Sequence, residues 1–173
     1  MRRFAKIGKI TLVGVTGILV VPLVIGFYDH ITLPEILGLI ASIAIFQPLA
    51  AVIGLGLGID PIPLLLIMCS FGISVIFVLF GICDIFAERS EWLRNKLKKT
   101  ESVTQESGLL KKYGVYALIP FIWVPGVGLY GCVLIAWLFR WRGIKPVSVI
   151  FAGWILATIL VLLTSLGILK LIL

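Results

Sequence analysis

The chain has 173 residues, of which 61% are hydrophobic and only 13% are charged. A soluble globular domain is close to half apolar and a quarter charged, so this composition leaves too little polar surface for a water-soluble particle and excludes a cytosolic enzyme. The length allows one domain. The net charge of +7 is then expected at a membrane surface, where the positions of Lys and Arg record the topology.

Five apolar stretches follow one another, and a polar segment of residues 84–114 separates the third from the fourth. The stretches cover residues 10–28, 36–58, 62–83, 115–139 and 147–169. The first follows a basic N-terminus but is long for a signal peptide, so we expect a retained helix with a kink at Pro22. The third and the fifth are long enough to span a membrane and predict two further spanning helices.

The second and fourth stretches are interrupted near their middle. Gln47-Pro48 breaks the second, and the turn sequence Pro125-Gly126-Val127-Gly128 breaks the fourth. A proline removes a helical hydrogen bond and bends or ends a helix. Two alternatives follow: the prolines kink two full spanning helices, or each stretch is a re-entrant hairpin that enters and leaves the membrane on the same side.

The positions of the basic residues favour the second alternative. If all five stretches cross the membrane with the N-terminus inside, 7 Lys and Arg lie inside and 8 lie outside. If the second and fourth stretches are re-entrant, 14 of the 15 lie inside, as the positive-inside rule requires. If only the second stretch is re-entrant, 12 Lys and Arg lie inside and 3 lie outside. The prediction that the fourth stretch is also re-entrant therefore rests mainly on its Pro-Gly break.

We therefore expect an all-α polytopic membrane protein with three spanning helices and two re-entrant helical hairpins. Its N-terminus lies in the cytoplasm, and its C-terminus lies outside the cell membrane. The hairpins also resemble each other, because Phe46-Gln47-Pro48 precedes Gly54 with the same spacing by which Trp123-Val124-Pro125 precedes Gly131. Inverted repeats with broken helices are typical of secondary transporters, so the pattern is compatible with an inverted repeat.

The two breaks form the expected substrate site. A half-helix that begins inside the membrane presents backbone N–H groups with partial positive charge, which suit an anionic or electron-rich group. Gln47 adds an amide donor and acceptor at this depth. The alternative is that the glycines serve close helix packing. The residues expected to bind substrate are Gln47, Pro48, Pro125, Gly126, Gly128, Tyr130 and Gly131.

Other kinds of chemistry find little support in the sequence. No ionisable residue lies in the core of an apolar stretch, which argues against a proton-driven mechanism built on a central carboxylate. Without a metal-ligand cluster, catalytic triad or nucleotide motif, we expect no enzyme activity, no metal and no cofactor. The segment 84–99 can form an amphipathic helix on anionic lipid headgroups, and nucleic-acid binding is not expected.

The second hairpin carries a family resemblance. The sequence Lys111-Lys112-Tyr113-Gly114, followed by ALIPFIWVPGVGLYGCVLIAW, resembles the small multidrug export family of archaeal and bacterial membrane proteins. That family has a similar Tyr-Gly, an apolar run, Pro-x-Pro-Gly-Thr-Gly, an aromatic residue and a Gly. The positions that match are Pro125, Gly126, Gly128 and Gly131, with Tyr130 near the expected aromatic residue. Val127 replaces the Thr, and Trp123 replaces the first Pro.

The resemblance extends over roughly residues 35–170 but is weaker in the first hairpin. There PLAAVIGLGLGIDPIP is similar to the family's Glu-x-Arg-x-x-Ile-Pro-Leu-Gly stretch, although the Glu and Arg are missing and Gln47 is the nearest polar residue. A mechanism that uses that charged pair cannot apply here. The plan of broken hairpins also resembles the DedA superfamily, which implies translocation of a lipid-linked phosphate or proton-coupled transport, but the hairpin Arg of that superfamily is absent.

Three functions remain open from the sequence. The first is export of a small or amphipathic solute, which the resemblance implies. The second is translocation of a lipid or polyprenyl phosphate, and the third is a scaffold without transport activity. The expected partners are membrane lipids, a small-molecule or lipid substrate and, because so few helices are present, further copies of the chain in a homo-oligomer.

Overall fold

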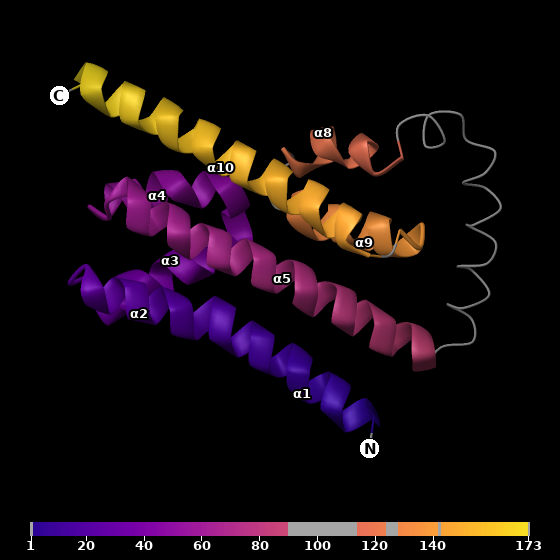
Figure 1. The fold of residues 1–173 in the computed structure, drawn as a ribbon. Helices are drawn as coiled ribbons and strands as arrows, with labels where there is room; N and C mark the ends of the chain where they lie inside the picture. Colours follow the sequence, from indigo (N-terminus) through magenta and orange to yellow (C-terminus); the bar gives the residue numbers. More distant parts are fainter. Residues whose placement is uncertain (1, 90–113, 124–127, 142, 173) are drawn as a thin grey trace.

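The computed structural model describes residues 2–89, 114–123, 128–141 and 143–172, and every regular element in these ranges is a helix (Figure 1). Four segments are long and apolar enough to cross a membrane: Ile7–Tyr28, Leu33–Gly56, Pro61–Phe86 and Ile144–Gly167. The all-helical, multi-pass class expected from the sequence is therefore confirmed. Residues 90–99 of the expected amphipathic helix lie outside the described residues.

The N-terminal segment consists of α1 (Arg2–Val15), a π-helical turn η1 (Thr16–Val20) and α2 (Val21–Tyr28). In the π turn, the Val21 N–H bonds to the Thr16 carbonyl five residues earlier. The next residue, Pro22, has no N–H to offer the Gly17 carbonyl. The hydroxyl of Ser70, in α5 (Pro61–Arg89), donates to that carbonyl over 2.8 Å, so the buried proline leaves no unpaired acceptor at Gly17.

Small residues allow this segment to lie close to α5. A side chain at Gly17 would overlap Ser74 of α5, and one at Gly81 of α5 would overlap Ile10. Close packing through small residues is typical of membrane helices, because lipid is as apolar as the side chains and burial alone drives little association. Because no Gly or Pro lies between Cys83 and Arg89, α5 continues past the expected end of the third stretch.

Helices α3 (Leu33–Phe46) and α4 (Ala50–Gly56) form a helical hairpin. α3 begins with a capping box, in which the Thr32 N–H bonds to the Glu35 carboxylate over 2.9 Å. After the 3₁₀ turn η2 (Gln47–Leu49), α4 runs back along α3. A Cβ at Gly54 would lie 3.2 Å from Leu39 Cδ1, whereas an uninterrupted helix would separate these two residues by about 22 Å.

A second hairpin is formed by η3 (Gly114–Leu118), α8 (Ile119–Ile122) and α9 (Gly128–Leu138). The Cys132 thiol of α9 donates to the Leu118 carbonyl of η3 over 3.5 Å, so α9 runs back beside the segment that precedes it. In Figure 1 this hairpin lies toward the end of the molecule where α10 (Ile144–Ile172) begins, and the α3–α4 hairpin lies toward the end where α10 terminates. Both hairpins contact α10.

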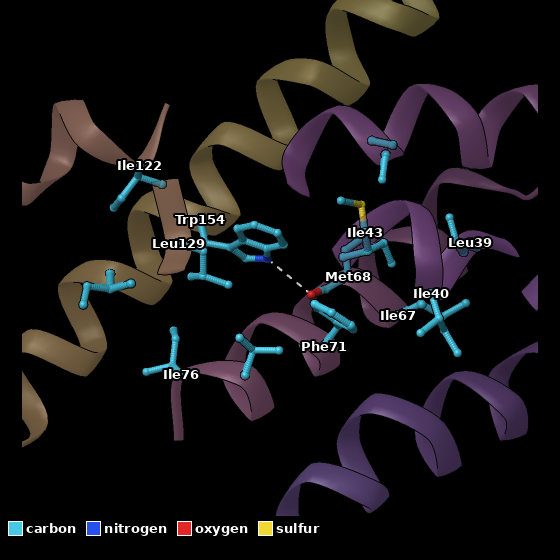
Figure 2. Close-up of a cluster of buried hydrophobic side chains, with 14 of the residues drawn as sticks. Leu39, Ile40, Ile43, Ile67, Met68, Phe71, Ile76, Ile122, Leu129 and Trp154 are labelled. Carbon is cyan, nitrogen blue, oxygen red and sulfur yellow. Dashed lines mark hydrogen bonds between the residues drawn. The ribbon is translucent and has the colours of Figure 1, made fainter. Parts of the chain in front are cut away.

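The core is centred on Trp154 of α10, whose side chain is completely buried (Figure 2). Its indole N–H donates to the Met68 carbonyl of α5 over 3.2 Å. Gly72 lies one turn further along α5, and a Cβ there would lie 2.5 Å from the indole nitrogen. Because Gly72 has no side chain, the indole of Trp154 can lie directly against the backbone of α5. Residues of all the surrounding helices join this cluster, among them Ile43, Ile122 and Leu129.

Gly72→Ala should lower the stability of the protein by about 1–3 kcal/mol, because the added methyl group displaces the buried indole from its site. The measurement is thermal unfolding in detergent, followed by near-ultraviolet circular dichroism. Gly38→Ala is the matched control: it also places Ala in a helix, but nothing lies within 4 Å of its Cβ, so we expect unchanged or slightly higher stability. Equal unfolding temperatures for Gly72→Ala and wild type would contradict tight packing at Trp154.

Candidate functional site

Gln47 occupies an unusual position at the end of α3. Its backbone has φ 55° and ψ −127°, a left-handed conformation that costs a residue other than glycine on the order of 1–3 kcal/mol. Its side chain is nevertheless completely buried. A glycine would adopt this backbone conformation without strain.

The amide of Gln47 connects the two hairpins. Its Oε1 accepts a hydrogen bond from the Leu129 N–H over 3.0 Å, at the N-terminus of α9. The first N–H groups of a helix have no partner within the helix, so Gln47 acts as a cap supplied from another element. Its Nε2, also buried, has no hydrogen-bond partner in the described part of the chain.

A second contact runs in the opposite direction. The Tyr130 hydroxyl of α9 donates to the Ala44 carbonyl of α3 over 2.7 Å. Ala44 belongs to the last turn of α3, whose carbonyls have no intrahelical partner, and Pro48, four residues later, has no N–H to offer. The end of α3 and the beginning of α9 therefore complete each other's backbone hydrogen bonding through one side chain each.

The backbone at the start of α9 is tightly enclosed. A side chain at Gly128 would overlap the Ile122 carbonyl of α8, and Gly128, Leu129 and Pro48 are all buried. Since a glycine has no side chain, α8 and the start of α9 can approach within backbone contact.

Five of the seven residues expected to bind substrate lie in the described part of the chain. Gln47 and Pro48 occupy the tip of the first hairpin, and Gly128, Tyr130 and Gly131 occupy the first turn of α9. The contacts of Gln47 and Tyr130 bring these two groups together. The remaining two, Pro125 and Gly126, lie outside the described residues.

Sequence reasoning missed several contributors to this region. Ala44 and Leu129 contribute only backbone atoms, which no side-chain pattern reveals. Trp154 follows Ala152-Gly153, and Ala157-Thr158 lie about one helical turn after it. Small residues near one aromatic residue were the available signal for a packed interior position. No group of His, Cys, Asp or Glu in the described ranges could hold a metal ion.

Comparison with known proteins identifies one family. Residues 37–160 match the family model described as "Putative small multi-drug export protein", which covers both hairpins, α5 and the first half of α10. A comparison with curated proteins gives no match, and neither does a comparison with solved structures.

Tyr130→Phe should destabilise the protein by about 1–3 kcal/mol, because it leaves the Ala44 carbonyl unpaired in an apolar interior. Thermal unfolding in detergent measures the effect. Tyr116→Phe removes the same hydroxyl from a side chain that is 67% exposed, and it should change the unfolding temperature little. If both variants unfold like wild type, the contact between the hairpins contributes nothing measurable.

Proposed function

Because the chain belongs to the small multidrug export family, we propose that it exports a small or amphipathic solute across the membrane and binds it between the tips of the two hairpins. The observation that carries the proposed site is the Gln47 amide, which is completely buried, has a strained backbone and has no hydrogen-bond partner for Nε2 in the described residues. A buried polar group without a partner is costly, and such costs concentrate at sites of function.

The chemistry of this amide defines what it can hold. Nε2 donates hydrogen bonds and accepts none, and it lies beside the N-terminus of α9, where the helix dipole is positive. A carbonyl, carboxylate or similar acceptor on the solute would satisfy Nε2. The apolar residues around the site, such as Ile43 and Leu129, would contact the rest of an amphipathic molecule.

If both hairpins are re-entrant, the proposed site lies near the middle of the membrane, where a solute that crosses the membrane would meet it. α2 and α4 end, and α3 and α5 begin, at one end of the molecule, where Asp29 and Asp60 occur. The opposite end is formed by the first turns of α1, the end of α9 and the start of α10 (Figure 1), and the sequence in and beside these segments contains Lys9, Arg140 and Lys145. If the basic end faces the cytoplasm, the hairpins enter from opposite sides as an inverted repeat and place their helix breaks near the midplane, where surrounding protein can shield non-helical backbone.

Single cysteines can test this topology in a variant without the three native cysteines. His30→Cys and Asp60→Cys flank the α3–α4 hairpin and should both react with a membrane-impermeant maleimide from outside intact cells, whereas Lys145→Cys should react only after permeabilisation. Reaction of positions 30 and 60 from opposite sides would mean that Leu33–Gly56 crosses the membrane.

Gln47→Met tests the site, because methionine has a similar volume but has no amide donor; it also removes the oxygen that accepts the Leu129 N–H, so near-ultraviolet circular dichroism must first show that the variant is folded. In proteoliposomes loaded with norfloxacin, a fluorescent solute that carries carbonyl acceptors, we expect its efflux to fall by about tenfold or more, since losing a buried hydrogen bond to a charged group costs roughly 1.5–3 kcal/mol.

Two controls accompany this experiment. Ser42→Ala changes a polar residue of α3 whose hydroxyl bonds only within its own helix, and it should transport norfloxacin like wild type. Fluorescent-lipid scrambling in the same vesicles detects translocation of lipid instead of solute. Wild-type vesicles that scramble lipid but release no norfloxacin, or folded Gln47→Met that exports at the normal rate, would refute the proposed site.

A further inference from the structure

The side-chain nitrogen of Gln47 differs from the other buried polar side-chain atoms that the structure describes. Three polar side chains are buried in the described ranges, those of Gln47, Ser74 and Thr158. Among their nitrogen and oxygen atoms, Gln47 Nε2 is the one that is fully enclosed without a hydrogen-bond partner. Because an amide nitrogen donates two hydrogen bonds and accepts none, the hydrogen bonding still missing at the hairpin tips is that of an acceptor.

The backbone carbonyls around this amide already have donors. The Ile43 carbonyl accepts the Gln47 N–H, and the Ala44 carbonyl accepts the Tyr130 hydroxyl. On the other side of the turn, the Ala50 N–H bonds to the Gln47 carbonyl. A solute oxygen that reaches this position can therefore accept from Nε2, whereas a solute N–H group meets no buried side-chain acceptor in the described residues that lacks a partner.

The charges near the hairpin tips also disfavour a cation. No charged side chain is buried in the described ranges, and residues 124–127, which precede α9 in the chain, are Val, Pro, Gly and Val. An ammonium ion would have to leave water without a carboxylate to pair with, which is unfavourable. The N-terminus of α9, where Gln47 Oε1 accepts the Leu129 N–H, adds partial positive charge.

We propose that the Gln47 amide makes this site selective for solutes whose polar head accepts hydrogen bonds and donates none, such as a ketone, an ester or a carboxylate. A head group that also carries N–H donors would leave them buried without acceptors, which weakens binding. Gln47 is completely buried, so a solute reaches it in a conformation in which the hairpin tips have moved apart. Binding at this position rests on the proposed function, which places the solute between the tips.

Three naphthalene compounds of the same shape test this selectivity. The first, 2-acetylnaphthalene, carries a ketone; 2-isopropenylnaphthalene replaces the ketone oxygen by a CH₂ group, and 2-naphthamide replaces the methyl group by NH₂. Equilibrium dialysis of the purified full-length chain in detergent measures binding, with the partition of each compound into empty micelles subtracted. We expect the ketone to bind at least about fivefold more tightly than either other compound, the ratio that a difference of about 1 kcal/mol produces.

Nuclear magnetic resonance of the side-chain amides assigns the contact. The chain contains two glutamines, Gln47 and Gln105, so nitrogen-15 labelling of glutamine side chains gives the signals of two NH₂ groups. Gln105→Glu removes one of them and identifies the other as that of Gln47; this variant should bind the ketone like wild type. Saturating 2-acetylnaphthalene should move a Gln47 amide proton downfield, because that proton gains an acceptor, and 2-isopropenylnaphthalene should not.

Two results would overturn the proposal. One is a wild-type protein that does not bind the ketone, or that binds it no more tightly than the two other compounds. The other is a Gln47 amide signal that stays in place when the ketone is bound. These outcomes are separate from that of the proposed function: ketone selectivity can hold in a protein that exports no norfloxacin, and norfloxacin export can depend on Gln47 in a protein that binds the ketone and the amide equally.

Discussion

The fold depends on hydrogen bonds to the backbone N–H and C=O groups at helix ends that lie far from water. In an apolar environment every backbone N–H and C=O needs a partner within the protein, yet this chain ends α3 and begins α9 in its interior. The amide oxygen of Gln47 caps α9 through Leu129, and the hydroxyl of Tyr130 satisfies the end of α3 through Ala44. Each broken helix thus supplies a hydrogen-bonding group to the end of the other.

The same principle operates at Pro22, where Ser70 of α5 satisfies the Gly17 carbonyl. Around these polar contacts the helices pack through small residues, and the largest side chain of the core, Trp154, lies over Gly72. Polar contacts are few and each is specific, whereas the apolar packing is extensive. This combination holds a bundle of interrupted helices together, and among the described residues the buried amide nitrogen of Gln47 has no hydrogen-bond partner.

Sequence reasoning located much of this arrangement. The prolines and glycines at residues 47–48 and 125–128 predicted both interruptions, and the polarity of Gln47 marked the tip of the first hairpin as a candidate site. The cavity that Trp137 and Trp141 line together with Phe77, Phe80 and Asp84 was not predicted. In the sequence Phe77 and Phe80 look like ordinary residues of the third apolar stretch, and Asp84 looks like the start of the polar segment. A cavity belongs to several helices at once, and no single segment carries its signal.

The sequence by itself therefore determined that this is a helical membrane protein with two broken segments. The features that determined it act locally: composition, the lengths of the hydrophobic stretches, and the positions of proline and glycine. The tertiary structure alone decided which atoms meet. Gln47 and Leu129 are 82 residues apart, and Tyr130 and Ala44 are 86 residues apart. Hydrogen bonds over such separations depend on the packing of every helix between them, and half of the partners are backbone atoms that every residue possesses.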